Sequence, residues 1–135
     1  MNASEETRAV VEACARGSHD GTLDFPAVVA RLTAADVESY HADYRRAETT
    51  YYLAGGATHV VALPSPPVPV ADAFAADAVR DAVLGSQRGE VRYPGFLRLT
   101  RAAGCVGYIV WIAGRRVQYF GRRGEVHTEH FPDAR

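Results

Sequence analysis

The spacing of apolar residues changes from a helical to a strand-like period, and it does so in both halves of the chain. Over residues 4–35, apolar side chains recur every three or four positions, as on one face of a helix. Over 37–63 they alternate with polar residues or form short β-branched and aromatic runs, which is typical of strands. Residues 72–103 and 105–131 repeat this order. Each half is therefore predicted to be helix, helix, strand, strand, strand.

Polar and glycine residues predict where these elements begin and end. Ser4 is expected to cap a first helix that stops at Gly17, and Asp72 is expected to cap its counterpart, which stops at Gly85. Asp24 is expected to cap the second helix of the first half. The second helices are predicted over residues 24–35 and 93–103, and the strands over 37–44, 49–53, 59–63, 105–112, 116–120 and 126–131.

The two halves also match residue by residue at a shift of 68 positions. Tyr40, Tyr51 and His59 fall on Tyr108, Tyr119 and His127 without a gap. The 54 positions from 11 to 64 contain 12 identities with their counterparts, about three times the number expected by chance. An internal duplication is therefore predicted.

A duplication of this kind predicts an α+β fold in which one antiparallel sheet carries helices packed on it about a pseudo-twofold axis. We expect one domain over residues 1–135. The first repeat is predicted at about 4–64 and the second at about 72–132, joined by the proline-rich connector 65–71.

Composition and charge exclude several classes of function. The 135 residues are 47% apolar with a net charge of −1, so we expect a packed interior and neither nucleic-acid nor membrane partners. All 15 basic residues are Arg, which excludes lysine Schiff-base chemistry. No cofactor is expected. The N-terminal stretch lacks the features of a secretory signal, and Cys14 and Cys105 are expected to be buried thiols, so a cytoplasmic location is expected.

Several short aromatic and glycine-containing motifs occur in a distinctive order. They are Tyr40-His41-Ala42-Asp43, Thr50-Tyr51-Tyr52, Tyr93-Pro94-x-Phe96, Ala103-Gly104-Cys105-x-Gly107-Tyr108, and a final run from Tyr119-Phe120-Gly121 to His127-x-Glu129. In this order the chain resembles the YbcV-like family of unknown function, whose members are usually labelled "phage envelope protein". The resemblance implies a small cytoplasmic α+β domain of this size. It implies no reaction, cofactor or catalytic residue.

The last predicted strand has the densest cluster of polar side chains. His127 and Glu129 are expected on one face of the strand and His130 on the other. A histidine beside a carboxylate can act as a general base, with the carboxylate orienting the imidazole ring. The alternative is an edge strand whose polar face is solvated.

His59 and His127 occupy matching positions in the duplication. A pseudo-twofold axis would place them either close together or at opposite ends of the molecule. If they met, they could bind a metal together with Glu129 or Asp43. The alternative is that both histidines follow a glycine turn for the sake of hairpin geometry. Because no established metal-ligand spacing is present, no metal site is expected.

The duplication is broken on the first predicted strand of each half. His41 and Asp43 share a polar face, but their counterparts Ile109 and Trp111 are apolar. Such asymmetry is expected where one half has acquired a one-sided site. The alternative is that the His41 face is solvated and that Trp111 covers an edge or a partner.

Seven tyrosines provide both apolar area and hydroxyl groups. Tyr40 and Tyr108 are expected in the core. Tyr51 and Tyr119 are predicted to bind ligand, because their neighbours Tyr52 and Phe120 can fill the core from the other side of the strand. These residues would suit a pocket for a small planar or hydrophobic molecule.

Together these patterns predict a small-molecule-binding domain with one pocket between the two halves. If the protein is an enzyme, cofactor-free acid/base chemistry of the isomerase, cyclase or hydratase type is expected, with a tyrosine hydroxyl polarising the substrate. The alternative is a non-catalytic interaction or regulatory module that forms a homodimer through Trp111 and a free sheet edge. The predicted catalytic residues are His41, His127 and Glu129, and the predicted ligand-binding residues are Tyr51, Tyr119, Asp43, His59 and Trp111.

Overall fold

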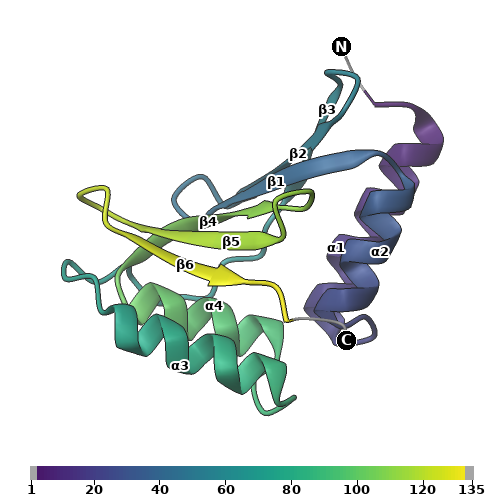
Figure 1. Cartoon of the computed structure of the whole chain (residues 1–135). Helices are drawn as coiled ribbons and strands as arrows, with labels where there is room; N and C mark the ends of the chain where they lie inside the picture. The colour runs from purple at the N-terminus through teal and green to yellow at the C-terminus, as the bar shows by residue number, and fades with distance from the viewer. Residues whose placement is uncertain (1–2, 133–135) are drawn as a thin grey trace.

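A computed structural model describes residues 3–132, and within that range the chain forms four α-helices and one six-stranded antiparallel sheet (Figure 1). The predicted α+β class and the order helix, helix, strand, strand, strand in each half are confirmed. The elements are α1 (Glu5–Asp20), α2 (Phe25–Ala34), β1 (Val37–Asp43), β2 (Glu48–Leu53), β3 (Thr58–Ala62), α3 (Ala76–Gln87), α4 (Tyr93–Ala102), β4 (Cys105–Trp111), β5 (Arg116–Gly121) and β6 (Val126–His130).

The two halves meet in the middle of the sheet, whose strand order is β3-β2-β1-β4-β5-β6. Strands β1 and β4 pair with His41 opposite Ile109, so each half contributes three consecutive strands outward from this junction. A pseudo-twofold axis therefore passes between β1 and β4. As a result, β3 and β6 form the two opposite edges of the sheet.

Backbone geometry repeats between the halves even where the side chains differ. Ala47 and Arg115, which are 68 positions apart, have φ values of 56° and 54°. Their carbonyls accept equivalent hydrogen bonds from the amides of Leu63 and Phe131. All eight left-handed positions in residues 3–132 form pairs at this spacing, namely Gly21 with Gly89, Asp36 with Gly104, Ala47 with Arg115, and Gly56 with Gly124.

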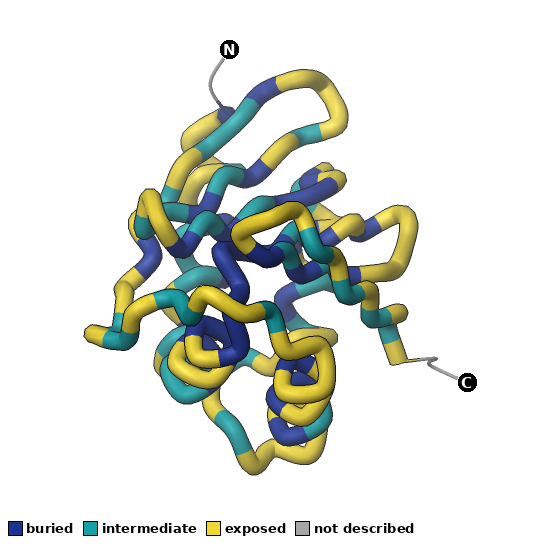
Figure 2. The backbone as a smooth tube through the Cα atoms, turned by 90° about the vertical axis from the view of Figure 1, so that its left-hand side faces the viewer, coloured by how far each residue is buried: buried dark blue, intermediate teal, exposed yellow. Residues whose placement is uncertain are grey.

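One face of the sheet packs on the helices and the other face carries no helix. In Figure 1 the pairs α1–α2 and α3–α4 lie on the same side of the strands. Figure 2 shows the buried backbone concentrated between these layers. The expected placement of Tyr40 and Tyr108 in the core is confirmed. The core includes Val11, Leu32, Val79 and Leu97 from the four helices and Tyr40, Ala42, Tyr108 and Val110 from the central strands.

The predicted ends of α1 and α3 were wrong for the same reason in both halves. Helix α1 continues through Gly17 to Asp20, and α3 continues through Gly85 to Gln87. A Cβ on Gly17 would lie 2.5 Å from Leu23 Cδ1, and one on Gly85 would lie 2.7 Å from Val91 Cγ2. These glycines therefore allow the following loop to pack closely against the helix and do not terminate it.

The start of α3 also differs from the expectation. Ala75 takes the N-cap position, and no side chain caps the helix. Asp72 lies outside the helix, where its Oδ1 atom is 3.8 Å from Arg122 Nε. Its carboxylate therefore faces the turn that follows β5 and not the helix N-terminus.

A buried polar network joins the two halves behind the sheet. The hydroxyls of Tyr44 and Thr100 lie 2.8 Å apart, and Thr100 Oγ1 donates to the carbonyl of Phe96 at 2.8 Å. Arg101 Nη2 donates to the Tyr44 carbonyl and to Ser65 Oγ, each at 3.0 Å. Its guanidinium also lies over the Tyr44 ring. This network ties the connector and α4 to the end of β1.

Both cysteines are buried and free, as expected. Burial raises the pKa of the Cys105 thiol to about 12 and also raises that of Cys14. Both thiols therefore stay protonated near neutral pH and are poor nucleophiles.

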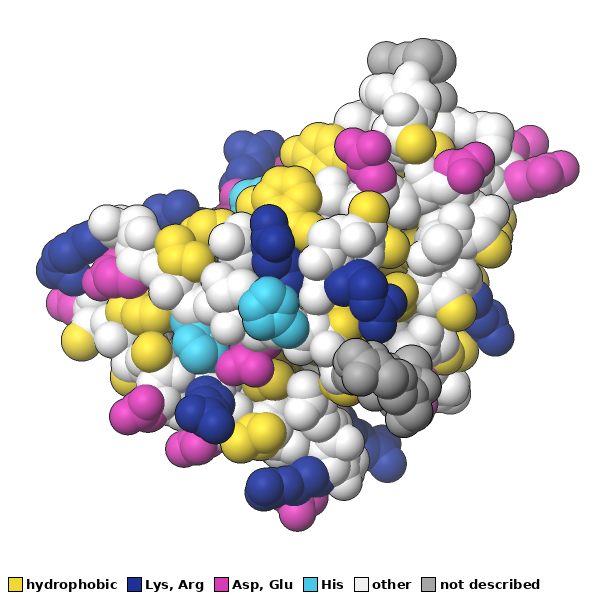
Figure 3. Space-filling view, viewed as in Figure 1, with side chains coloured by type: hydrophobic (Ala, Val, Ile, Leu, Met, Phe, Trp, Pro, Cys, Tyr) yellow, Lys and Arg dark blue, Asp and Glu magenta, His cyan; other side chains and the backbone are white. Residues whose placement is uncertain are grey.

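The surface of the molecule mixes charges of both signs. Figure 3 shows acidic and basic side chains interspersed on one side of the protein, in keeping with the net charge of −1. None of the helices in residues 3–132 is long and apolar enough to cross a membrane.

Candidate functional site

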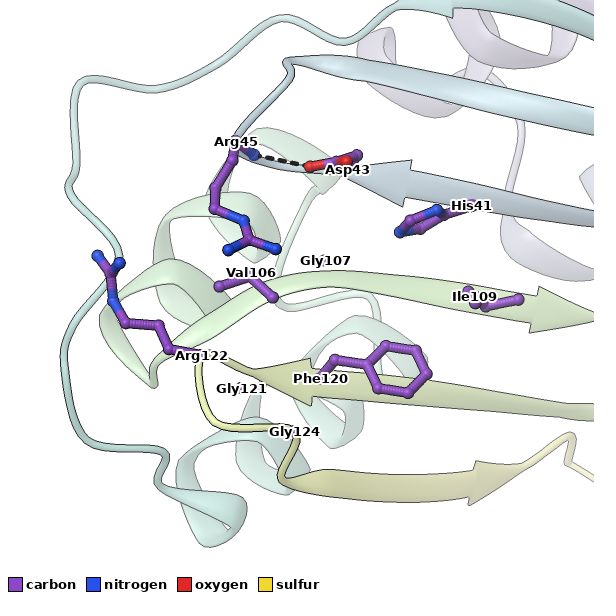
Figure 4. Close-up of a pocket in the computed structure, with 10 residues that line it drawn as sticks. All are labelled: His41, Asp43, Arg45, Val106, Gly107, Ile109, Phe120, Gly121, Arg122 and Gly124. Carbon is purple, nitrogen blue, oxygen red and sulfur yellow. Dashed lines mark hydrogen bonds between the residues drawn. The ribbon is translucent and has the colours of Figure 1, made fainter.

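The uncovered face of the sheet contains a hollow of about 410 Å³ at one end of β1, β4 and β5 (Figure 4). We call this face the open face and this feature the open-face hollow. Its position places side chains of both repeats around one space. The lining residues are His41, Asp43, Arg45, Val106, Gly107, Ile109, Phe120, Gly121, Arg122 and Gly124.

A glycine on β4 leaves the floor of the hollow without a side chain. A Cβ on Gly107 would lie 2.4 Å from the carbonyl oxygen of Ala42, so the backbones of β1 and β4 approach too closely for any larger residue. Gly121 on β5 lines the hollow through its backbone, since a Cβ there would point to the helix side and lie 2.9 Å from Phe74 Cδ1. The hollow therefore follows from backbone packing as well as from the side chains at its rim.

The pseudo-twofold axis relates the hollow to the other end of the open face, where the side chains differ. The counterpart of Asp43 is Trp111, that of Gly107 is Ser39 and that of Phe120 is Tyr52. Trp111 and Tyr52 are 38% and 40% exposed on the open face. Both ends thus carry one aromatic residue, Phe120 or Tyr52, but one end bears Trp111 and Ser39 where the other bears Asp43 and Gly107.

The polar groups of the hollow are held by the turn after β1. Asp43 Oδ1 accepts hydrogen bonds from the backbone amides of Arg45 at 3.1 Å and Arg46 at 3.2 Å. Figure 4 shows the Arg45 side chain reaching back over the hollow toward Val106. Within residues 3–132, Arg45 forms no ion pair. Its guanidinium is therefore available to an incoming anion.

Arg122 supplies a second positive charge at the rim. Its Nη2 atom donates to the carbonyl of Val70 at 2.8 Å, which directs the side chain toward the connector (Figure 4). On the opposite wall, the ring of Phe120 and the side chain of Ile109 provide an apolar surface. The hollow therefore combines cationic groups, one imidazole and one carboxylate with an apolar wall.

Among the predicted site residues, His41 and Asp43 line the hollow. Trp111 lies on the same face at the other end of β4, where its Nε1 donates to Gln118 Oε1 at 2.9 Å. These three residues share the open face, as their strand alternation requires.

His127 and Glu129 lie elsewhere, on the helix side of the edge strand β6. His127 Nε2 and Glu129 Oε2 are 2.5 Å apart, and both side chains are about three-quarters buried. The imidazole lies 6.4 Å from the ring of Tyr119. Figure 3 shows histidine next to an acidic side chain on this side of the molecule. The predicted pairing of these two residues on one strand face is present, with His130 on the other face and exposed.

His59 lies at the opposite edge of the sheet, on β3. Its Nε2 atom is 2.9 Å from Glu12 Oε2, which links β3 to α1. The arrangement in which His59 and His127 meet is therefore wrong, because the pseudo-twofold axis relates opposite edges. Within residues 3–132, no three His, Cys, Asp or Glu side chains gather as a set of metal ligands.

The structure reverses the predicted faces of the neighbouring aromatic residues on β2 and β5. Tyr51 and Tyr119 lie in the core on the helix side, where burial raises the pKa of both hydroxyls. Tyr52 is exposed, and Phe120 lines the open-face hollow. The predicted alternation along the strands is correct, but the strand face that packs on the helices is the one that carries Tyr51 and Tyr119.

The structure does not bring the three predicted catalytic residues and the two predicted ligand-binding tyrosines together. His41 lies on the open face, whereas the other four lie on the helix side of the sheet. A pocket formed by all of them would have to pass through the sheet. The four are Tyr51, Tyr119, His127 and Glu129.

Sequence reasoning missed Arg45, Arg122 and Phe120 as residues of the hollow. Their signal was present in the duplication, since the counterparts of Arg45 and Arg122 are Ala113 and Ala54. Comparing the turns position by position would have shown alanine in place of each of these two arginines at the equivalent end, where the arginines of the turn are instead Arg115 and Arg116. Phe120 was expected in the core, because the sequence does not say which strand face the helices cover.

Comparison with known proteins assigns the chain to a family for which no function is described. No curated protein matches the chain significantly. The family described as "Protein of unknown function (DUF1398)" matches residues 17–130, a range that contains all six strands and three complete helices. The chain therefore belongs to the DUF1398 family of proteins of unknown function.

Proposed function

We propose that the protein binds a small anionic molecule with a flat apolar part in the open-face hollow. The observation that carries this proposal is the broken symmetry of the open face. One end of the open face has a bare glycine at Gly107 beside Asp43, and the equivalent end has Ser39 beside Trp111. A symmetric packing requirement would produce similar residues at both ends.

The chemistry of the hollow favours an anion. The Arg45 guanidinium offers several N–H donors in a planar fork that suits a carboxylate or a phosphate. Arg122 adds a second arginine at the rim, with the Asp72 carboxylate 3.8 Å from its Nε atom. The face of Phe120 and the Ile109 side chain supply the apolar contact that an aromatic or other planar group would make.

His41 and Asp43 add orientation to this site. They project from the same face of β1, two residues apart, so both point into the hollow from one wall. The imidazole can donate to the ligand or accept from it, while the carboxylate can only accept. We therefore infer a ligand whose anionic group lies near Arg45 and whose hydrogen-bond donor lies near Asp43.

Binding is proposed here in place of catalysis. The acid/base reaction expected from the sequence paired a histidine base with a tyrosine hydroxyl. No tyrosine lines the open-face hollow among residues 3–132. The resemblance to YbcV-like proteins stays a prediction and contributes nothing to the choice between binding and catalysis.

The proposal is tested by measuring binding of benzoate, phenyl phosphate and the neutral analogue benzamide by calorimetry and thermal shift. The two anions are expected to bind and to raise the melting temperature, because they bind the folded state only. The Arg45→Ala variant is expected to raise their Kd by about tenfold, since one charge-assisted hydrogen bond contributes on the order of 1.5 kcal/mol. Benzamide is expected to bind more weakly than either anion.

Two control variants make the test specific. Arg80→Ala removes an exposed arginine from α3, away from the open face, and His127→Ala removes a histidine from the helix side. Both are expected to leave the Kd of the anions unchanged, whereas His41→Ala is expected to raise it. Equal effects of Arg45→Ala and Arg80→Ala would show that the arginines act only through general charge and would contradict the proposal.

A further inference from the structure

The open face carries most of the large apolar side chains that the protein exposes. Among residues 3–132, six large hydrophobic residues are exposed, and four of them project from this face. Phe25 and Leu99, on α2 and α4, are the other two. Exposed apolar residues concentrated on one sheet face are typical of a protein–protein interface. The four are Tyr52, Val60, Trp111 and Val126.

Strand β4 makes this face complementary to itself. Its side chains on the open face are, in order, none at Gly107, an intermediate one at Ile109 and the largest at Trp111. Gly107 and Trp111 are each two residues from Ile109, a spacing of about 6.8 Å along a strand. The strand thus has no side chain on one side of Ile109 and its largest side chain, Trp111, at the same distance on the other side.

We propose that a second copy of this chain docks on the open face through a twofold axis that runs across the strands at Ile109. Two β4 strands stacked face to face and antiparallel place each Trp111 over the Gly107 of the other copy. The indole of each copy then enters the open-face hollow of its partner. The interface is isologous, so the same contacts occur twice and the assembly closes as a dimer.

The neighbouring strand agrees with this arrangement. On β5, Phe120 pairs with Gly107, and Arg116 pairs with Trp111, so they lie on opposite sides of the same axis. Stacking therefore places the Arg116 guanidinium over the Phe120 ring of the partner, a cation–π contact. On β4 and β5, no charged group faces another of the same sign across this axis.

The size of the face suits a dimer that can dissociate. Six strands of about six residues, spaced about 4.8 Å apart, give a projected area on the order of 500 Å². Side-chain relief increases the area that is actually buried, which approaches the roughly 800 Å² per partner of a standard interface. Stacked sheets lie about 10 Å apart and cross at about 30°, so the contacts close to the axis are kept.

The dimer does not depend on the ligand proposed above, but it uses the same hollow. A bound anion and the partner's indole would occupy one space and therefore exclude each other. Ligand binding is then expected to shift the protein toward the monomer. The two proposals can fail separately, because Arg45→Ala removes ligand affinity and Trp111→Ala removes the dimer contact.

The test is sedimentation equilibrium over a wide range of protein concentration, combined with tryptophan fluorescence. Trp111 is the only tryptophan in the chain. In the dimer its indole is buried, so the emission maximum is expected to shift to shorter wavelength as concentration rises. Trp111→Ala is expected to raise the dimer dissociation constant by at least about thirtyfold, the effect of losing a central aromatic anchor.

Two further variants complete the design. Ile109→Asp places two carboxylates against each other on the axis and is expected to abolish the dimer. Its counterpart in the first repeat is His41, so a polar side chain at this position is compatible with the fold. Leu99→Ala removes an equally exposed apolar side chain from α4 and is expected to leave dimerisation unchanged.

The outcomes separate clearly. A dimer that Trp111→Ala and Ile109→Asp dissociate, and that Leu99→Ala leaves intact, supports the proposal. A wild-type protein that stays monomeric at every concentration overturns it. A dimer that keeps its affinity after Trp111→Ala also overturns the proposal, because the Trp111 side chain would then lie outside the interface.

Discussion

At the scale of single residues, the candidate site depends on what is missing as much as on what is present. Gly107 leaves the floor bare, and Asp43 replaces the bulk that Trp111 provides in the other repeat. His41 and Asp43 could be predicted as site residues because the duplication supplies an internal reference for each position. Arg45 lies in a turn, where arginines are common for reasons of solubility alone, so its place at the hollow became clear only from its direction in space (Figure 4).

The buried contact between Thr100 and Tyr44 gives a prediction at this scale. Thr100→Val keeps the shape of the side chain but leaves the Tyr44 hydroxyl without its partner in the core. The free energy of unfolding is expected to fall by about 1–3 kcal/mol, the cost of an unsatisfied buried hydroxyl. Urea denaturation of both proteins measures the difference.

Thr33→Val serves as the matched control. Thr33 also donates its hydroxyl to a helix carbonyl, that of Val29 at 2.7 Å, but it lies on the surface. Its replacement is expected to change stability by less than about 0.5 kcal/mol. Equal effects of the two substitutions would show that the Tyr44–Thr100 contact contributes little.

At the scale of helices and strands, local sequence explains the elements well and their ends less well. The change from helical to alternating period predicted every strand, because one face of each strand is more apolar than the other. The ends of α1 and α3 were misplaced because glycine has two uses that look identical in sequence. It can end a helix with a positive φ, as Gly21 does, or allow close packing within a helix, as Gly17 does.

Helix glycines therefore give opposite predictions in two places. Gly17→Ala puts a methyl group 2.5 Å from Leu23 Cδ1 and 2.6 Å from its Cγ, so it is expected to destabilise the protein by about 1–3 kcal/mol. Gly95→Ala in α4 places its methyl group at 3.6 Å or more from its neighbours. It is expected to stabilise by about 0.5–1 kcal/mol, because alanine loses less backbone entropy on folding.

Thermal unfolding followed by circular dichroism measures both variants under one set of conditions. The sign of the change is the test, since both substitutions add one methyl group to a helix. If Gly17→Ala were as stable as Gly95→Ala, the loop at Leu23 would be free to move aside and the close packing would not be required.

At the scale of the whole molecule, the sheet separates the chain's polar chemistry into two places. The helix side holds the buried tyrosines and the edge pair His127–Glu129, and the open face holds the hollow and Trp111. The pseudo-twofold axis keeps His59 and His127 at opposite edges. No pattern in the sequence specifies this division, because it depends on which strands pair and which face the helices cover.

The buried tyrosine hydroxyls and cysteine thiols predict that the protein loses stability at high pH. Burial raises the pKa of Tyr108 and Cys105 to about 12 and also raises those of the other core tyrosines. In the unfolded chain these groups ionise at about 8.5–10, so there the unfolded state binds fewer protons than the native state. Their stabilising contribution is complete below that range and is lost as the pH rises from about 9 toward 12.

Urea titrations at a series of pH values measure this dependence, with tyrosinate absorbance recorded in parallel. The midpoint is expected to fall above about pH 9, and most tyrosines are expected to ionise only as the protein unfolds. Ionisation of all the tyrosines while circular dichroism still reports a folded protein would contradict the burial of the core hydroxyls.

The sequence by itself determined the α+β class, the order of elements and the internal duplication, because periodicity and repetition are local properties of the chain. It also singled out His41 and Asp43, which line the hollow, through their difference from Ile109 and Trp111. Only the tertiary structure decided which strand faces are covered, which residues share a space and where the exposed aromatic residues gather. The physical reason is that these features follow from strand pairing between the repeats and from helix packing on one side, which involve residues far apart in the chain.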